Sequence, residues 1–242
     1  MSADQPTIVA TSIGFDPRGG DQYDWSPGPI FDLCVERSGA VGTPRICFVP
    51  TASGDNLTYI SAVYSALGGR FLTSHLEVFS MPNYDDVRGH LLAQDVVWVG
   101  GGSVANLLAL WRLHGWDEHL RAAWEAGVVL GGVSAGSICW HAGGTTDSFG
   151  PALRPVTNGL GFLPYSNGVH YDSEEQRRPL FHSLIENGVL PTGFATDDGA
   201  GLVYAGTELV DVVADRADSH GYAVRLENGR AVEEVLPTRR LR

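Results

Sequence analysis

The chain has 242 residues, which is enough for one large α/β domain or two small ones, and its 43% hydrophobic and 18% charged residues exclude wholesale disorder. Its formal net charge of −12 repels phosphates and anionic lipid, so we expect neither a nucleic acid nor a membrane as a partner. No apolar run approaches the roughly 18–20 residues that are needed to span a bilayer.

The N-terminus and the cysteines predict where the protein is found and which chemistry it lacks. Residues 1–6 contain neither the basic nor the apolar region of a signal peptide, which predicts a cytoplasmic protein. Cys34, Cys47 and Cys139 form no C-x-x-C pair and no zinc-binding spacing, so we expect reduced thiols, no metal and no cofactor. Cys139 is predicted to be a small core residue.

Strands and helices alternate through the first half of the chain. Short apolar runs predict strands over residues 7–11, 45–50, 76–80, 96–99 and 128–130. Apolar residues at helical spacing predict helices over residues 30–38, 58–67, 87–92, 104–114 and 117–125. The Gly-, Pro- and Asp-rich residues 16–29 predict a loop.

The second half of the chain is less regular. Its predicted elements are a loop over residues 143–168, a helix over 179–187, strands over 201–204, 208–213 and 223–227, and a hairpin turn at 227–230. The alternation in the first half predicts an α/β fold: an open, mostly parallel sheet with helices on both faces, in a single domain over residues 1–242. Ligands of such sheets bind beyond the carboxyl ends of the strands.

The most informative motif follows the predicted strand 128–130. Gly132-Val133-Ser134-Ala135-Gly136 is a G-x-S-x-G sequence, which predicts a strand, a sharp turn with serine at its apex, and a helix. This geometry exposes the Ser134 hydroxyl and directs the Ala135 N–H toward the group that the serine attacks. Ser134 is therefore the candidate nucleophile, although the same residues are also common in an ordinary strand-to-helix turn.

A glycine-rich turn follows the neighbouring strand. Gly100-Gly101-Gly102-Ser103 connects the predicted strand 96–99 to the helix 104–114. Backbone without side chains at a strand end can bring N–H groups to a ligand oxyanion. We therefore expect Gly101 or Gly102 to form an oxyanion hole with Ala135.

A serine nucleophile needs a base and a group that orients the base. His170 begins an acidic loop and is the candidate base, whereas His141 is expected two turns along the helix after Ser134 and pointing away from it. His90, His114, His119 and His182 fall in predicted helices. The acids that could orient His170 are Asp147, Asp172, Glu174, Glu175, Asp197 and Asp198.

An arginine pair lies close to the candidate base. Arg177 and Arg178 follow Glu174 and Glu175. Arginine suits bidentate binding of a carboxylate, so the pair could bind an anionic substrate. The alternative is charge pairing at i,i+3 where a helix begins.

Together these segments resemble the peptidase E group of serine aspartyl dipeptidases, which are related to cyanophycinase and have a class I glutamine-amidotransferase-like fold. The motifs that carry the resemblance, which runs from about residue 7 to about residue 213, are Gly100-Gly-Gly-Ser-Val-Ala-Asn-Leu-Leu, Gly132-Val-Ser-Ala-Gly and His170-Tyr-Asp-Ser-Glu-Glu-Gln-Arg-Arg-Pro. It implies Ser134 as the nucleophile and His170 as the base. It also implies a short peptide substrate with an N-terminal aspartate.

The chain departs from this family in two places. The family acid is a glutamate, and the matching position here is Asp198, with Asp197 second; Asp147 also resembles a family site position and is a candidate substrate ligand. Ser103-Val104 stands where family members often have Asn-Thr. The resemblance therefore bears more firmly on the mechanism than on the substrate.

Three functions remain open from the sequence. The first is a serine peptidase acting on short peptides, including Asp-X dipeptides, and the second is an esterase or amidase acting on a small non-peptide substrate. The third is a non-catalytic binding module on the same scaffold. A glutamine amidotransferase proper would require cysteine at position 134, where this chain has Ser134. The sequence does not fix the oligomeric state.

Overall fold

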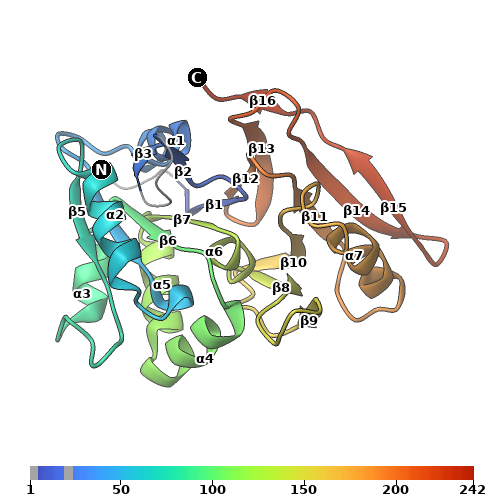
Figure 1. Cartoon of the computed structure of the whole chain (residues 1–242), viewed down its shortest axis with the longest axis horizontal. Helices are drawn as coiled ribbons and strands as arrows, with labels where there is room; N and C mark the ends of the chain where they lie inside the picture. Colours follow the sequence, from blue (N-terminus) through green and yellow to red (C-terminus); the bar gives the residue numbers. More distant parts are fainter. Residues whose placement is uncertain (1–4, 19–23) are drawn as a thin grey trace.

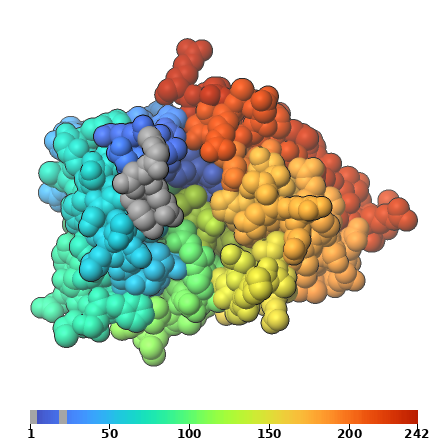
Figure 2. Space-filling model, viewed as in Figure 1, coloured from blue at the N-terminus to red at the C-terminus, as the bar shows by residue number. Residues whose placement is uncertain are grey.

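The computed structural model describes residues 5–18 and 24–242, and within them the chain forms two large β-sheets that lie side by side (Figure 1). The chain up to Val133 supplies five strands of the first sheet, and the rest of the chain supplies its other three strands and the whole second sheet. The blue-to-green residues lie on one side of the molecule and most of the yellow-to-red residues on the other (Figure 2). Residues 1–4 of the N-terminus that was predicted to lack a signal peptide lie outside the described residues. So do residues 19–23 of the predicted loop 16–29.

The first sheet has eight strands, and its centre is parallel. In spatial order the strands are β16 (Arg239–Arg240), β13 (Glu208–Ala214), β12 (Ala200–Ala205), β1 (Thr7–Thr11), β7 (Val129–Val133), β6 (Val96–Val99), β4 (Arg45–Val49) and β5 (Leu72–His75). Neighbours from β1 to β5 pair in parallel, whereas β12 is antiparallel to both β1 and β13. Strands that are buried on both faces have continuous apolar runs, which is why the sequence predicted most of this sheet.

Helices cover both faces of the first sheet (Figure 1). One layer contains α1 (Pro29–Ser38) and α2 (Leu57–Leu67), and the other contains α3 (Val87–Leu92), α4 (Val104–His114) and α5 (Trp116–Glu125), with the 3-10 turn Thr51–Ser53 after β4. In β6, Val96 and Trp98 join the core under α1 and α2, whereas Val97 and Val99 join the opposite core. The predicted fold class, an open and mostly parallel sheet with helices on both faces, is confirmed.

The second sheet has six strands and was not predicted as a separate sheet. In spatial order its strands are β15 (Arg230–Val235), β14 (Gly221–Glu227), β11 (Gly193–Thr196), β10 (Leu163–Gly168), β8 (His141–Thr146) and β9 (Arg154–Val156). Helix α7 (Arg177–Glu186) packs on β14 and β15 through Phe181, Ile185 and Tyr222. The predicted hairpin turn at residues 227–230 joins β14 to β15.

The prediction of a loop over residues 143–168 is wrong, because the segment contains most of β8 and all of β9 and β10. Its glycines are required for close packing of backbone. A Cβ on Gly143 would lie 2.2 Å from the Val156 carbonyl oxygen, and one on Gly144 would lie 2.3 Å from that of Asn167. Glycine-rich composition here reflects close strand approach rather than a turn.

Two predicted elements in the first half differ from the structure. The strand predicted at residues 76–80 is instead β5, at Leu72–His75, because the N–H groups of Val78 and Phe79 donate to the Asp55 carboxylate at 2.6 and 2.9 Å rather than to a strand. Within the predicted loop 16–29, β2 (Phe15–Pro17) and β3 (Trp25–Pro27) pair as a short antiparallel ribbon.

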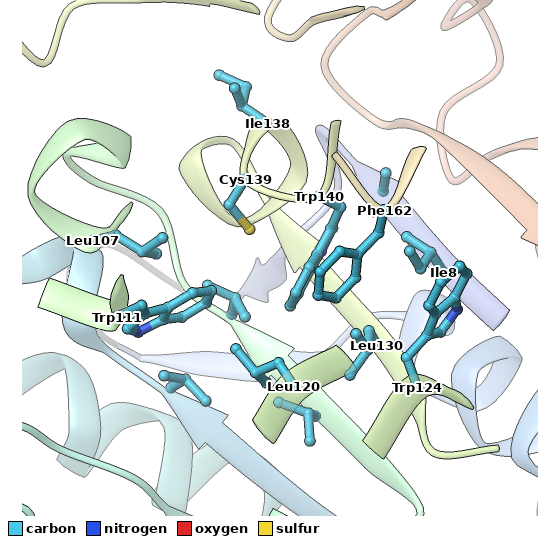
Figure 3. Packing of buried hydrophobic residues seen from close by; sticks show 14 of the residues in the cluster. Ile8, Leu107, Trp111, Leu120, Trp124, Leu130, Ile138, Cys139, Trp140 and Phe162 are labelled. Carbon is cyan, nitrogen blue, oxygen red and sulfur yellow. The ribbon is translucent and has the colours of Figure 1, made fainter. Parts of the chain in front are cut away.

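A large aromatic cluster packs under α6 (Ala135–Ile138), the short helix after Ser134 (Figure 3). The rings of Trp140 and Phe162 lie 5.8 Å apart, and Trp124 stacks on Phe162 at 5.5 Å. Cys139 is fully buried in the same core, and its pKa is raised well above the usual value by burial. Cys139 is thus a core residue, as predicted, and all three cysteines are free.

None of the helices in the described ranges combines the length and the apolar character that a membrane crossing requires.

His141 is buried at the start of β8, because α6 ends at Ile138 and the predicted long helix does not form. Its Nδ1–H donates to the Ser137 carbonyl at 2.9 Å, and its Nε2 accepts from the Tyr204 hydroxyl at 3.2 Å. Burial lowers the pKa of His141 from 6.5 to about 4. A neutral imidazole is therefore part of the folded core.

This burial predicts a pH-dependent stability. Because the unfolded state binds a proton at His141 below about pH 6.5 and the folded state does so only near pH 4, stability falls as the pH drops through this range. Between pH 7 and pH 5 we expect His141 to account for a loss of about 2 kcal/mol. Urea unfolding should show a smaller loss over this interval for His141→Gln than for the wild type. The exposed His114, changed to Gln, is the control, and equal losses in all three proteins would contradict the expectation.

Candidate active site

Ser134 lies at the apex of a strained turn between β7 and α6. Its φ is 59° and its ψ is −113°, a conformation that non-glycine residues rarely adopt. The Ser134 N–H donates to the Thr11 carbonyl at 3.1 Å, and the Ser134 carbonyl accepts from the N–H groups of Ser137 and Ile138. The side chain is half-buried, and its hydroxyl makes no hydrogen bond to another described residue. The predicted strand, sharp turn and helix are all present.

Two glycines make this turn possible. A Cβ on Gly132 would lie 2.4 Å from the Gly136 carbonyl oxygen, and a Cβ on Gly136 would lie 2.3 Å from the Val99 carbonyl oxygen. Real Cβ atoms do not approach backbone oxygen so closely, so both positions require glycine. Strand β7 and helix α6 therefore pack directly against the end of β6.

The triple-glycine turn lies beside Ser134. β6 and β7 are paired neighbours, and a Cβ on Gly101 would lie 3.5 Å from the Ser134 Cβ. The N–H groups of Gly101 and Gly102 make no hydrogen bond to any described residue, whereas Gly100 and Ser103 on either side donate to backbone carbonyls. As the first residue of α6, Ala135 has an N–H that needs no helical partner. Three backbone donors are thus available around Ser134.

His170 forms a close pair with Asp198. The histidine follows β10, and the aspartate lies in the turn between β11 and β12. His170 Nδ1–H donates to Asp198 Oδ1 at 2.5 Å, and the two side chains are 23% and 29% exposed. The hydrogen bond from His170 lowers the pKa of the Asp198 carboxyl below its usual value, and one from Ser173 lowers it further. Because Nδ1 is occupied, Nε2 is the nitrogen left to accept a proton.

The serine and histidine turns lie against consecutive residues of the same strand end. Ser134 N–H donates to the Thr11 carbonyl, and His170 N–H donates to the Ser12 hydroxyl at 3.1 Å. Thr11 is the last residue of β1, which the sequence predicted as a strand without assigning it to the site. In the sequence, only the position of Thr11 at the end of a predicted strand, before Ser-Ile-Gly, could have indicated that it lies at the site.

The other candidate acids have different partners. Asp197 is 2% exposed and accepts from the Tyr222 hydroxyl at 2.9 Å and from the His220 N–H at 3.0 Å, and burial raises its pKa. Asp172 accepts from the Asp198 N–H at 2.8 Å. Asp147 is exposed and lines a cavity of about 480 Å³ with Glu174 and Glu175. Among the candidates, Asp198 is the acid hydrogen-bonded to the imidazole.

Arg177 and Arg178 both make hydrogen bonds, ion pairs or ring contacts with other residues of the protein. Arg177 is buried, bonds both carboxylate oxygens of Glu174 at 2.8 and 3.0 Å, and donates to the Thr145 carbonyl at 2.5 Å. This is the i,i+3 pairing that the sequence left open, and it occupies the guanidinium that was a candidate substrate ligand. Arg178 lies over the Tyr171 and Tyr222 rings and 3.5 Å from a carboxylate oxygen of Glu233. The structure therefore does not support an arginine pair that is free to bind substrate.

Within residues 5–18 and 24–242, no group of three or more His, Cys, Asp or Glu side chains is arranged to hold a metal ion.

The packing of the turn predicts that Gly136→Ala unfolds or distorts it. The added methyl group would overlap the backbone of Val99, so we expect a loss of at least about 1–3 kcal/mol of stability. Gly14→Ala is the matched control, since a Cβ there would meet only Val133 at 3.9 Å. Thermal unfolding of the two variants measures the difference. A Gly136→Ala protein as stable as the wild type would show that the turn tolerates a side chain.

Comparisons with known proteins place the chain in a family. The family model of Peptidase family S51 matches residues 29–212. The uncharacterized peptidase YgaJ of Bacillus subtilis is 44% identical over 225 residues, which cover 92% of this chain and 96% of that protein. Peptidase E of Streptomyces coelicolor is 30% identical over 128 residues, which cover 52% of this chain and 51% of that protein.

Two solved structures share the fold. A putative peptidase E protein from Listeria monocytogenes EGD-e has a TM-score of 0.58 at 17% identity, over 84% of this chain and 96% of that one. A peptidase from an acI-B1 Actinobacterium has a TM-score of 0.64 at 16% identity, over 97% of this chain and 95% of that one. The resemblance to the peptidase E group is confirmed, and the chain belongs to Peptidase family S51, a family of serine peptidases.

Proposed function

We propose that this protein hydrolyses short peptides through a triad of Ser134, His170 and Asp198. The observation that carries the proposal is the His170–Asp198 hydrogen bond at 2.5 Å, in a turn that the end of β1 links to the strained turn of Ser134. A nucleophile in such a turn, a histidine and a buried or half-buried acid that orients the histidine are the parts of serine-dependent acyl transfer.

Each group of the triad has a role in the proposed reaction. His170 Nε2 takes the proton of the Ser134 hydroxyl as the oxygen attacks the peptide carbonyl, and then gives it to the leaving amine. Asp198 accepts the Nδ1–H throughout, which holds the imidazole in the required tautomer and stabilises its cation. The lowered pKa of Asp198 keeps this group a carboxylate at neutral pH. Water then hydrolyses the acyl-enzyme with His170 acting as the base again.

The backbone supplies the oxyanion hole. We assign the N–H groups of Ala135 and of Gly101 or Gly102 to the negative oxygen of the tetrahedral intermediate. Two observations support this assignment. The N–H groups of Gly101 and Gly102 make no hydrogen bond to a described residue, and Gly101 lies against Ser134. Donors that are fixed before the reaction need no reorganisation when the charge develops, which is why such groups contribute strongly to catalysis.

We propose dipeptides as substrates, with Asp-X dipeptides as the first class to test. The cavity of about 480 Å³ that Asp147 lines with Glu174 and Glu175 is acidic, which suits the free amino group of a short peptide. Because Arg177 is engaged by Glu174, the contact to an aspartate side chain is proposed for Arg178, which would have to give up its ion pair with Glu233 to make it.

We also propose that both sheets form one domain. The serine comes from the first sheet, and His170 follows a strand of the second, so neither sheet contains the whole site. Helix α6 contacts strands of both sheets, which places the nucleophile turn at their junction.

Ser134→Ala should abolish peptide hydrolysis while leaving the melting temperature close to that of the wild type, because only a hydroxyl without a described partner is removed. Asp198→Asn should lower kcat by about three to four orders of magnitude through the wrong imidazole tautomer. A fluorophosphonate should label the wild type at Ser134 and should not label Ser134→Ala. Turnover by Ser134→Ala near the wild-type rate, or labelling elsewhere, would refute the proposed nucleophile.

The substrate proposal predicts that Asp-Leu is hydrolysed faster than Ala-Leu and Asn-Leu. Asn-Leu differs from Asp-Leu only in charge, so the ratio of their kcat/KM values isolates recognition of the carboxylate. Arg178→Ala should lower this ratio, and Arg154→Ala, which changes an exposed arginine, is the charge-matched control. Equal rates for Asp-Leu and Asn-Leu would end the Asp-X proposal. Hydrolysis of simple esters without hydrolysis of any dipeptide would replace the peptidase proposal by the esterase alternative.

A further inference from the structure

Ser12 follows the last residue of β1, and its backbone is bonded to the turn that carries Asp198. The Ser12 N–H donates to the Ala200 carbonyl at 2.9 Å, and the Ser12 carbonyl accepts from the Gly199 N–H at 3.1 Å. Gly199 directly follows Asp198 in the chain. Two backbone hydrogen bonds to Ser12 thus fix the point at which the aspartate turn joins β12 of the first sheet.

The hydroxyl of Ser12 is bonded to the turn that carries His170. It accepts from the His170 N–H at 3.1 Å and lies 2.8 Å from the Thr196 hydroxyl and 3.3 Å from the Thr196 carbonyl oxygen. Since the hydroxyl accepts from His170, its own proton is free to go to Thr196. Ser12 is 7% exposed, so water does not easily replace these bonds.

The backbone of His170 needs such a bond. Its φ is 53°, in the left-handed region that non-glycine residues adopt uncommonly and at a cost in free energy. The direction of the imidazole follows from this backbone conformation. Without an acceptor for the His170 N–H, the turn can relax toward negative φ, and the ring then moves away from the direction that it has in the structure.

We propose that Ser12 is a positioning residue that sets the imidazole of His170 and the carboxylate of Asp198 at their working separation. All three polar groups of Ser12 are used, one for the histidine turn and two for the aspartate turn. The preceding residue, Thr11, accepts from the Ser134 N–H, so the end of β1 contacts all three turns of the triad. The inference rests on the proposed function, because it gives Ser12 a role in the same site.

The test compares Ser12→Ala with the wild type in kcat and KM for a dipeptide that the wild type cleaves. A shift of about 1 Å in a catalytic group can cost about 100-fold in rate, so we expect kcat to fall by about 10- to 100-fold. KM should change by less than about 3-fold, since Ser12 contacts the triad turns and not the proposed substrate cavity. The rate of Ser134 labelling by a fluorophosphonate should fall with kcat.

Ser12→Thr retains the hydroxyl and should recover most of kcat. Ser38→Ala is the matched control, because Ser38 is also buried and its hydroxyl also accepts a backbone N–H, that of Ala40. Ser38 lies at the end of α1, far from the triad in the chain. This control should lower the melting temperature and leave kcat unchanged. If Ser12→Ala does not fold, Ser12→Cys takes its place, since a thiol keeps the size and is a weaker acceptor.

The outcomes separate the two proposals. Wild-type kcat in a folded Ser12→Ala or Ser12→Cys protein, together with an inactive Ser134→Ala, overturns the role of Ser12 alone. Loss of kcat in Ser38→Ala to the same degree also overturns it, because the effect would then come from lowered stability. Activity in Ser134→Ala overturns the proposed function itself.

Discussion

The close packing of β6 against β7 and α6 is the constraint on which the site depends. A Cβ on Gly136 would lie 2.3 Å from the Val99 carbonyl oxygen, and a Cβ on Gly132 would lie 2.8 Å from the same oxygen. A non-glycine residue with positive φ is unfavourable by itself, so Ser134 keeps its conformation only because the chain on both sides of it is held. The same contact places the glycine turn after β6 beside the hydroxyl.

The site also requires that the two sheets keep a fixed position relative to each other. Ser134 comes from one sheet, and His170 follows a strand of the other. The aromatic cluster of Trp111, Trp124, Trp140 and Phe162 packs between α4, α5 and the strands beneath α6 (Figure 3). Large rings bury much area with few rotatable bonds, so this core resists sliding of the sheets. The strand end at Thr11 links the same parts through hydrogen bonds.

The sequence predicted the parts whose geometry is local. The G-x-S-x-G turn, the triple-glycine turn and the buried parallel strands each follow from a few adjacent residues, and the structure has both turns and every one of these strands except the one predicted at residues 76–80. The second sheet was missed because its strands use Gly143 and Gly144 where backbone approaches backbone, and single-sequence patterns assign such residues to loops. The shift of β5 has a similar cause, since the bonds from Val78 and Phe79 to Asp55 join residues distant in the chain.

Side-chain partners were predictable only where the spacing was short. The Glu174–Arg177 pair is three residues apart and could be foreseen as an alternative. The His170–Asp198 pair spans 28 residues, and the choice of Asp198 came from the family resemblance rather than from the pattern. Asp197 and Asp198 are adjacent in sequence, but one carboxylate bonds Tyr222 and the other bonds His170. Which of two neighbouring acids meets the imidazole depends on the direction of the turn, which the packed structure alone determines.

Ser103 stands where members of the family often have asparagine, and its hydrogen bonds show how the glycine turn is held here. Ser103 accepts from the Asn106 N–H at 3.2 Å and so caps the start of α4, and its own N–H donates to the Ala52 carbonyl at 2.8 Å. These two bonds fix the end of the glycine turn without an asparagine side chain. The N–H groups of Gly101 and Gly102 make no hydrogen bond to any described residue, which is the property that an oxyanion site requires. The backbone donors beside Ser134 therefore do not depend on an asparagine side chain at position 103.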